Sequence, residues 1–438
     1  MMYYSTGGHA PEATLQQAVI QGLAEDRGLY MPRRIPRLPE GFFEEIPRRS
    51  FQDIACTVAE AFFGEDVPRD VLHRIVRGTL SFDCPLVPVT DRIAALELFH
   101  GPTLAFKDVG ARFLARLLAH LTAGQADSRP LNVLVATSGD TGSAVANGFL
   151  GVEGIHVFVL YPKGKVSPIQ ECQFTTLGGN ITALAVEGVF DDCQALVKLA
   201  FLDPELNRAL RLTSANSINV ARFLPQAFYY FHAYAQWKRL GHPGRPVICV
   251  PSGNFGNLCA ALFSARMGLP VKRFIAANNR NDVFFEYLQT GVYRPRPSVQ
   301  TLANAMDVGD PSNFARIRDL YGGDWEAIRR DISGFTCTDE QIRAAIDRCL
   351  RENGYLLDPH GACGYLALQD GLRADETGIF CETAHPAKFR ETVEAATGSP
   401  VSIPARLQAF MAGEKLAVDL PADFAAFKQY LLHFHSSC

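Results

Sequence analysis

One lysine occupies a setting that is unusual for a cation. Residues 98–108 read LFHGPTLAFKD, so an apolar run enters a Gly-Pro turn and Lys107 follows directly after Phe106. Apolar residues then recur three and four positions apart, a spacing that predicts a helix beginning near Lys107. The positive end of a helix dipole disfavours an ammonium and lowers its pKa, which suits an amine that attacks a carbonyl. Because most lysines are solvated surface charges, these residues alone leave a catalytic and a structural role open.

The loop at residues 251–257, PSGNFGN, lies between an expected buried strand and an expected helix. Its glycines allow the backbone to approach a ligand, and the helix start offers unpaired N–H groups, which is what a phosphate requires. The loop lacks both the G-x-G-x-x-G spacing of dinucleotide sites and the G-K-[ST] ending of nucleoside triphosphate sites. We therefore expect the phosphate of a smaller molecule, with an ordinary strand-to-helix turn as the alternative.

Three more groups have side chains of suitable type. Residues 138–142, SGDTG, form another expected strand–loop–helix junction with free helix amides. Residues 216–222, NSINVAR, are polar, and Arg222 can bind a phosphate through two parallel hydrogen bonds. Thr383 comes directly after an expected strand, at the edge of a parallel sheet where ligands bind. A polar loop, a surface charge and a core hydroxyl are the structural alternatives, but together with Lys107 these groups favour a phosphorylated cofactor and an anionic substrate.

Composition narrows the class of protein. The chain of 438 residues is long enough for two domains, and its 20% charged residues and net charge of −4 give no basic excess for nucleic acid. The N-terminus lacks the pattern of a signal peptide, and no apolar run approaches the ~20 residues that span a bilayer. Eleven scattered cysteines without a C-x-x-C pair indicate free thiols in a reducing cytoplasm, with no metal site. An enzyme is expected, and a binding protein is the alternative.

The elements that must position these groups alternate along most of the chain. Residues 1–83 carry mainly helical patterns, including a capping box at Thr14–Gln17. After residue 84, buried strands alternate with amphipathic helices, which predicts parallel sheets with helices on both faces. We expect strands at 131–136, 155–161, 180–186, 247–250, 274–277 and 378–381. We expect helices at 143–150, 191–202, 225–240, 282–290 and 338–353. Residues 295–337 are expected to form a covering segment.

Eight motifs, in order and spacing, resemble those of the threonine synthases, pyridoxal-phosphate enzymes of fold type II in the tryptophan synthase β-like group. They are HGPTLAFKD (100–108), TSGDTG (137–142), YPKGKVSPIQ (161–170), LGGNI (177–181), SANSIN (214–219), PSGNFGN (251–257), NAMDV (304–308) and TAHPAKF (383–389). The resemblance implies an α/β fold of two open, mostly parallel three-layer αβα domains with a mainly helical N-terminal region. We expect that region at 1–83, a large pyridoxal-phosphate-binding domain at 84–130 and 243–438, and a smaller α/β domain at 131–242.

The same resemblance implies roles for single residues, with pyridoxal 5'-phosphate as the cofactor. Lys107 is similar to the catalytic Schiff-base lysine. The implied cofactor-binding residues, of which Thr383 meets the pyridine nitrogen, are Lys107, Gly253, Asn254, Phe255, Gly256, Asn257 and Thr383. The implied holders of the substrate's phosphate are Thr141, Asn216, Ser217 and Arg222. Two positions depart from the common pattern: many relatives have Asn in place of Asp140, and the usual Ser-Thr-Arg-Gly start reads Ser-Thr-Gly-Gly at residues 5–8, so a helper arginine is missing or supplied elsewhere.

The implied activity is that of a carbon–oxygen lyase acting on phosphates. It converts O-phospho-L-homoserine and water to L-threonine and phosphate by γ-elimination and β-addition of water, the last step of threonine biosynthesis. Lys107 would take the α-proton, while the cofactor spreads the resulting negative charge. A threonine hydroxyl at the pyridine nitrogen, in place of a carboxylate, would leave that ring largely unprotonated and suppress transamination.

Two rival functions stay open at this point. A dehydratase or other β-replacement enzyme of the same fold would need a substrate without phosphate, which the polar cluster at 216–222 argues against. A catalytically silent relative that only binds a cofactor or phosphate ester would typically lack Lys107. We expect a cytoplasmic monomer or homodimer that acts on a small molecule, with no nucleic acid and no membrane as partner.

Overall fold

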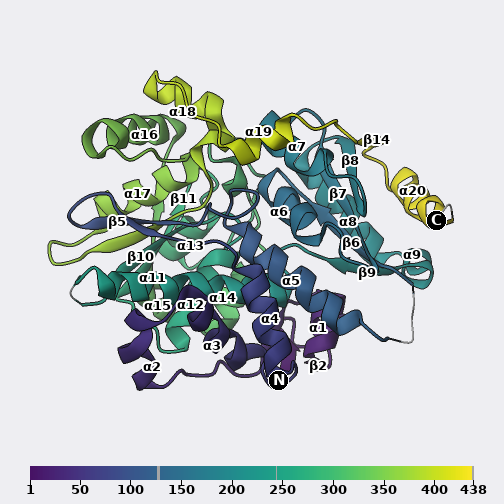
Figure 1. Ribbon diagram of the computed structural model, residues 1–438, viewed down its shortest axis with the longest axis horizontal. Helices are drawn as coiled ribbons and strands as arrows, with labels where there is room; N and C mark the ends of the chain where they lie inside the picture. The colour runs from purple at the N-terminus through teal and green to yellow at the C-terminus, as the bar shows by residue number, and fades with distance from the viewer. Residues whose placement is uncertain (126–128, 243, 437–438) are drawn as a thin grey trace.

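Two sheets organise the chain (Figure 1). The computed structural model describes residues 1–125, 129–242 and 244–436. The larger sheet has six strands in the order β12-β11-β10-β13-β5-β4, and the smaller has five in the order β14-β8-β7-β6-β9. All neighbouring strands in both sheets run parallel except β4 and β5. The predicted fold class, with two open and mostly parallel sheets between helices, is therefore confirmed.

The six-stranded sheet combines distant parts of the sequence. Its strands are β4 (Leu86–Pro88), β5 (Ile93–Glu97), β10 (Val247–Pro251), β11 (Arg273–Asn278), β12 (Ile332–Thr336) and β13 (Gly378–Glu382). Strand β13 comes last in the sequence yet lies between β10 and β5. Every residue of β10 and β13 is buried, because helices cover both faces. In Figure 1 the helices α16 (Asp339–Asn353) and α18 (Arg390–Thr397) lie above this sheet, and α11 (Ala227–Arg239) and α12 (Gly256–Arg266) lie below it.

The five-stranded sheet is built largely from one continuous stretch of chain. Its strands are β6 (Leu131–Ala136), β7 (Ile155–Pro162), β8 (Ile181–Glu187), β9 (Arg211–Ser214) and β14 (Val418–Pro421). The helices that accompany it are α5 (Lys107–Thr122), α6 (Asp140–Phe149), α7 (Pro168–Thr175), α8 (Phe190–Leu202), α9 (Pro204–Ala209) and α20 (Phe424–Ser436). The predicted domain division assigns everything after residue 243 to the large domain, whereas β14 pairs with β8 of this sheet. That division stays a prediction.

The N-terminal region is mainly helical, as expected, but also contains a small sheet. Its helices are α1 (Leu15–Gln21), α2 (Glu40–Glu45), α3 (Phe51–Phe63) and α4 (Arg69–Thr79). The capping box at Thr14–Gln17 is confirmed, with the two hydrogen bonds that define it. An antiparallel sheet of β1 (Met2–Ser5), β2 (Ala13–Thr14) and β3 (Tyr30–Pro32) was not predicted. Strands of two to four residues show too little alternation to be recognised from sequence.

The segment 295–337 is more than a cover. It contains the 3-10 turn η3 (Asn304–Met306), the helices α14 (Phe314–Leu320) and α15 (Trp325–Asp331), and β12 at the edge of the six-stranded sheet. The expectation of a covering segment is therefore wrong for its second half. Both helices have only seven residues, and β12 reads ISGFT with a single fully buried residue. The apolar periodicity of the helices and of the strand was therefore too short to be recognised in the sequence. Three further helices lie before and after this segment: α13 (Val283–Thr290), α17 (Pro359–Gly371) and α19 (Ala405–Met411).

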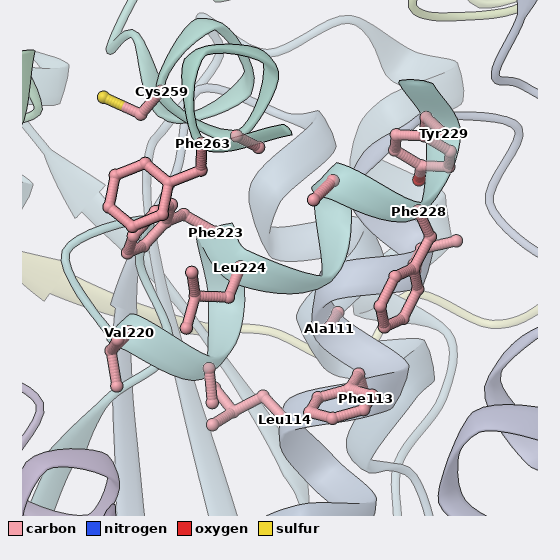
Figure 2. Packing of buried hydrophobic residues seen from close by; sticks show 14 of the residues in the cluster. Ala111, Phe113, Leu114, Val220, Phe223, Leu224, Phe228, Tyr229, Cys259 and Phe263 are labelled. Carbon is pink, nitrogen blue, oxygen red and sulfur yellow. The ribbon is translucent and has the colours of Figure 1, made fainter. Parts of the chain in front are cut away.

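A hydrophobic cluster joins four helices near the centre of the molecule (Figure 2). Phe113 of α5 lies 6.0 Å from Phe228 of α11, edge to face, measured between ring centroids. Phe223 of α10 (Val220–Phe223) makes the same kind of contact with Phe263 of α12 at 5.2 Å. Each such pair stabilises by about 0.5–1.5 kcal/mol beyond the burial of its area. The two ring pairs join α5 to α11 and α10 to α12, and α10 also packs against α5, so the cluster links all four helices. Among the described residues, no helix is long and apolar enough to cross a membrane.

Candidate active site

The carboxyl ends of β6, β10 and β13 face one cavity of about 450 Å³. All eleven residues that the sequence selected for a site line this cavity: Lys107, Thr141, Asn216, Ser217, Arg222, Gly253, Asn254, Phe255, Gly256, Asn257 and Thr383. The position agrees with the rule that ligands of open parallel sheets bind beyond the carboxyl ends of the strands. The structure thus brings the eleven residues together, while their individual roles stay predictions.

Lys107 is the first residue of α5, and the turn before it is tied to the segment after β13. Leu104 has φ +56°, an unusual value for a branched residue. The Phe106 N–H donates to Thr383 O at 2.9 Å, and the His385 N–H donates to Leu104 O at 3.1 Å. These two backbone bonds place Lys107 beside Thr383, although 275 residues separate them in the sequence.

The Lys107 side chain is partly buried, and its charge state is shifted accordingly. Burial lowers the pKa of Lys107 to about 8, the nearby cations of Lys388 and Arg222 lower it too, and the Asp140 carboxylate opposes them. Since an unperturbed lysine has a pKa near 10.4, a far larger fraction of Lys107 is neutral at physiological pH. A neutral amine is the form that attacks a carbonyl or accepts a proton.

A second lysine near the cavity, Lys388, is fully buried and pairs with Asp140, and it was not predicted from the sequence. Lys388 Nζ lies 2.6 Å from Asp140 Oδ1 and donates to Thr103 O at 2.9 Å. Gln170 Nε2 donates to the same carboxylate oxygen at 2.9 Å. Burial alone would raise the pKa of Asp140, but Lys388 and Lys107 outweigh it and hold the pKa below its usual range. The available signal was the rarity of lysine in this chain, since Lys388 stands between Ala387 and Phe389 in one of the quoted motifs.

The loop 251–257 carries a side-chain donor that has no acceptor among the described residues. Phe255 adopts φ +60° at the start of α12, a left-handed conformation that is strained for an aromatic residue. Asn257 Oδ1 accepts from the Tyr230 hydroxyl at 2.6 Å, and among the described residues its buried Nδ2 finds no partner. A Cβ on Gly253 would lie 2.7 Å from Ala305 O, so only glycine fits there. The loop therefore leaves room and unused N–H groups for a phosphate.

Arg222 supplies a buried positive charge near Lys107. Its Nη1 donates to Lys107 O at 3.0 Å, and its buried Nε has no partner among the described residues. Burial lowers the pKa of Arg222 to about 10, and the guanidinium forms no ion pair with any carboxylate that the structure describes. A buried cation without a counter-ion is costly unless an anion joins it. The arrangement is that of a receptor for an anionic group.

The loop 137–142 differs from its prediction. Thr137 Oγ1 accepts from the Gly139 N–H at 2.9 Å and from the Gly142 N–H at 2.8 Å. Two of the amides expected to hold an anion are thus already bonded, and the loop carries the Asp140 carboxylate. The interpretation of this loop as a second anion cradle is wrong in that respect, because side-chain capping by Thr137 cannot be read from glycine spacing.

His360 also lines the cavity and was not singled out in the sequence. Its Nδ1 contacts Asp358 Oδ1, and its Nε2 accepts from the Ala305 N–H at 3.2 Å. Because a backbone N–H can only donate, Nε2 is unprotonated and Nδ1 carries the proton. His360 thereby fixes the backbone that lies against Gly253. No spacing in the sequence points to this contact.

The residues present fit a phosphorylated aldehyde cofactor. A partly buried amine of lowered pKa, a loop with an unused N–H donor and a threonine hydroxyl meet in one cavity. Buried polar atoms without a described partner also line it, namely Arg222 Nε, Gln226 Oε1, Asn257 Nδ2 and Asn304 Oδ1. Buried polar groups normally find partners, so their concentration here indicates a polar ligand.

Three family models match the chain. One described as pyridoxal-phosphate dependent enzyme matches residues 90–379, threonine synthase N terminus matches 2–80, and threonine synthase, C-terminal, matches 361–431. Threonine synthase from Escherichia coli (strain K12) is 43% identical, with 99% of this chain and 100% of that protein covered. Its counterpart from Haemophilus influenzae is 44% identical with the same coverage.

Solved structures agree with these relatives. The crystal structure of threonine synthase from Escherichia coli has a TM-score of 0.92 at 42% identity and covers 99% of this chain and 100% of that one. The pyridoxal-phosphate-bound threonine synthase from Brucella melitensis has a TM-score of 0.92 at 37% identity and covers 99% of both chains. The predicted cofactor, pyridoxal 5'-phosphate, is confirmed, and the chain belongs to the threonine synthase family of pyridoxal-phosphate-dependent enzymes.

Proposed function

We propose that this protein converts O-phospho-L-homoserine and water to L-threonine and phosphate in the 450 Å³ cavity. One observation carries the proposal. A partly buried lysine of lowered pKa lines the same cavity as two buried donors that have no acceptor among the described residues, Asn257 Nδ2 of the loop 251–257 and Arg222 Nε. Two sets of donors for anions in one cavity with an amine match a phosphorylated cofactor and a phosphorylated substrate.

The cofactor would be held at both ends by residues described above. Lys107 would join it covalently, Gly253, Asn254, Phe255, Gly256 and Asn257 would bind its phosphate, and Thr383 would meet its ring nitrogen. The N–H groups of the first turn of α12 and the positive end of its dipole would stabilise the phosphate. When bound, pyridoxal phosphate withdraws electrons from the carbon atoms next to the substrate's amino group.

The chain's own groups then move protons and hold the substrate. Lys107, neutral in part at physiological pH, accepts the proton from the substrate's Cα and can return a proton to the carbon skeleton. Arg222, Ser217, Asn216 and Thr141 bind the γ-phosphate and stabilise it as it departs. Because Arg222 is buried, its charge is poorly screened by water, which strengthens these electrostatic contacts.

The rival with the same fold is a dehydratase that acts on an amino acid without phosphate. Such a substrate would leave the Arg222 guanidinium buried and unpaired, a state that costs several kcal/mol. The geometry therefore supports a phosphorylated substrate.

We also propose that the protein is a monomer or a homodimer, and analytical ultracentrifugation would distinguish the two.

Purified holoenzyme mixed with O-phospho-L-homoserine tests the function. Phosphate and L-threonine should appear in equal amounts, and Lys107→Ala should lower kcat by at least about a thousandfold because it removes the base. Lys163→Ala is the matched control, since Lys163 is half exposed and pairs with Asp419 far from the cavity. A higher kcat/KM for L-serine or L-threonine, with ammonia and a 2-oxo acid as products, would instead identify a dehydratase.

A further inference from the structure

The hydroxyl of Ser217 is surrounded by donors. Ser217 Oγ accepts from Asn254 Nδ2 at 3.0 Å and from Asn313 Nδ2 at 3.1 Å. A serine hydroxyl has two lone pairs and one proton, so these two bonds use both lone pairs. In the part of the chain that the structure describes, no acceptor for the Ser217 proton lies within hydrogen-bond distance, and Ser217 lines the cavity. The proton is therefore left to point at a ligand.

The orientation of both amides is fixed by partners that can only donate. Asn254 Oδ1 accepts from the Ser312 N–H at 2.6 Å, so the other terminal atom of Asn254 must be nitrogen. Asn313 Oδ1 accepts from Arg316 Nη1 at 2.6 Å, and arginine has no acceptor. Asparagine amides are otherwise easily assigned the wrong way round. Here a backbone N–H and a guanidinium settle both.

Arg316 is held too firmly to turn away from Asn313. It is fully buried, and its guanidinium donates to Tyr30 O at 3.2 Å, to Ser217 O at 3.0 Å and to Ile218 O at 2.6 Å. It lies 4.1 Å from the ring centroid of Phe223 and forms no ion pair with a described carboxylate. Arg316 thus connects the N-terminal region, the loop that carries Ser217 and the start of α14.

We propose that Arg316 and Asn313 are positioning residues for anion binding, which act by turning the Ser217 hydroxyl into an obligatory donor toward a phosphoryl group in the cavity. The direction of donation runs from Arg316 to Asn313, from Asn313 to Ser217 and from Ser217 to the ligand. A phosphoryl oxygen, which only accepts when ionised, completes this sequence, whereas a ligand N–H or O–H donor in its place meets another donor. The inference deepens the proposed function and rests on it for the presence of phosphorylated ligands.

Asn313→Asp reverses the sequence with almost no change of shape. One carboxylate oxygen still accepts from Arg316, but the other faces Ser217 Oγ and accepts its proton, which turns the hydroxyl away from the cavity. Two titrations separate the sources of the phosphoryl group: inorganic phosphate added to holoenzyme for the substrate's group, and pyridoxal phosphate added to the cofactor-free protein for the cofactor's. We expect Kd to rise at least tenfold in one of the two, and that titration identifies the group that Ser217 binds.

Ser217→Ala separates orientation from added charge. It should raise the Kd at least tenfold in the titration that Asn313→Asp affects. In the Ser217→Ala background, Asn313→Asp should then raise the Kd by less than about threefold more. Asn132→Asp is the matched control, because Asn132 is as deeply buried as Asn313 and its amide donates to backbone carbonyls far from the cavity. Circular dichroism checks the fold of each variant, and Ser217→Ala alone suffices if Asn313→Asp does not fold.

Wild-type affinity of Ser217→Ala or of folded Asn313→Asp in both titrations would overturn the proposal. So would an equal effect of Asn313→Asp with and without the Ser217 hydroxyl. Neither readout requires turnover of O-phospho-L-homoserine, so a failure of the proposed reaction and a failure of this inference are distinguishable.

Discussion

Two loops of this molecule read alike in sequence and act differently in structure. Residues 137–142 follow β6 and residues 251–257 follow β10, each with glycines and a helix behind. In the first loop, Thr137 Oγ1 accepts hydrogen bonds from two backbone amides, and the negative charge of Asp140 is paired with Lys388. The second loop leaves its donors open, with Asn257 Nδ2 unpartnered among the described residues. Glycine spacing thus predicts a ligand-facing loop, while the capping side chain decides which charge the loop accepts.

Lys388→Met should break the first loop most severely. It would leave the Asp140 carboxylate buried without its 2.6 Å partner, which costs about 3–5 kcal/mol of unfolding free energy. Urea denaturation measures the loss. The double variant Asp140→Asn with Lys388→Met removes the orphaned charge and should recover most of it. A loss below about 1 kcal/mol in the single variant would contradict the buried pair.

Gly253→Ala should break the second loop without touching the first. The new Cβ would meet Ala305 O at 2.7 Å and displace the backbone that is expected to hold the cofactor's phosphate. We expect the Kd of pyridoxal phosphate to rise on the order of a hundredfold, about 2.8 kcal/mol, in an absorbance titration. Gly41→Ala is the control, since nothing lies within 4 Å of its added Cβ. Equal affinity of the two variants would show that close approach at Gly253 is unimportant.

Thr137→Val tests the difference between the loops directly. Valine keeps the shape but leaves the Gly139 and Gly142 N–H groups without their acceptor, at a cost of about 1–3 kcal/mol in stability. The Kd of pyridoxal phosphate at the other loop should stay within about twofold. Thr79→Val provides a comparison, because the equally buried Thr79 only donates to Ile75 O within its own helix. A larger loss at Thr79 than at Thr137 would refute the capping role.

The smallest expected effect is the dependence on pH of the rate at which Lys107 combines with the cofactor. Lys107, with a pKa lowered to about 8, should combine with pyridoxal phosphate about tenfold faster at pH 9 than at pH 7 and little faster above pH 9. The sign follows from the amine, which reacts only after losing its proton as pH rises through its pKa. Stopped-flow absorbance on cofactor-free protein measures the rate. A rate still rising steeply at pH 10 would indicate a solvated lysine.

Long, regular elements were predictable from sequence. The predicted strand at 131–136 matches β6 in full, and the predicted helix at 338–353 matches α16. The residue types at its ends, Thr338 and Gly354, are those typical of helix caps. Short or solvent-facing elements such as β1 and β12 were missed, since two to five residues carry little periodicity. The position of the site followed from the rule for parallel sheets, and all eleven chosen residues reach the cavity.

Partners across the fold could not be predicted. Lys388, His360 and Arg316 each bond to residues far away in the sequence, from 55 to 286 positions, and their neighbours in sequence give no hint of those contacts. Their importance comes from burial, which makes one unpaired charge or donor costly enough to shape its surroundings. Such residues are visible only when hydrogen bonds are followed from atom to atom.

The place of β13 has a consequence for how the protein is made. This strand is the last of the six to leave the ribosome, yet β10 and β5 pair with its two edges, so the sheet stays divided until residue 382 is available. Thr383, which anchors the turn before Lys107, arrives at the same moment. We therefore expect that a nascent chain cannot complete the lining of its cavity before Thr383 has been synthesised.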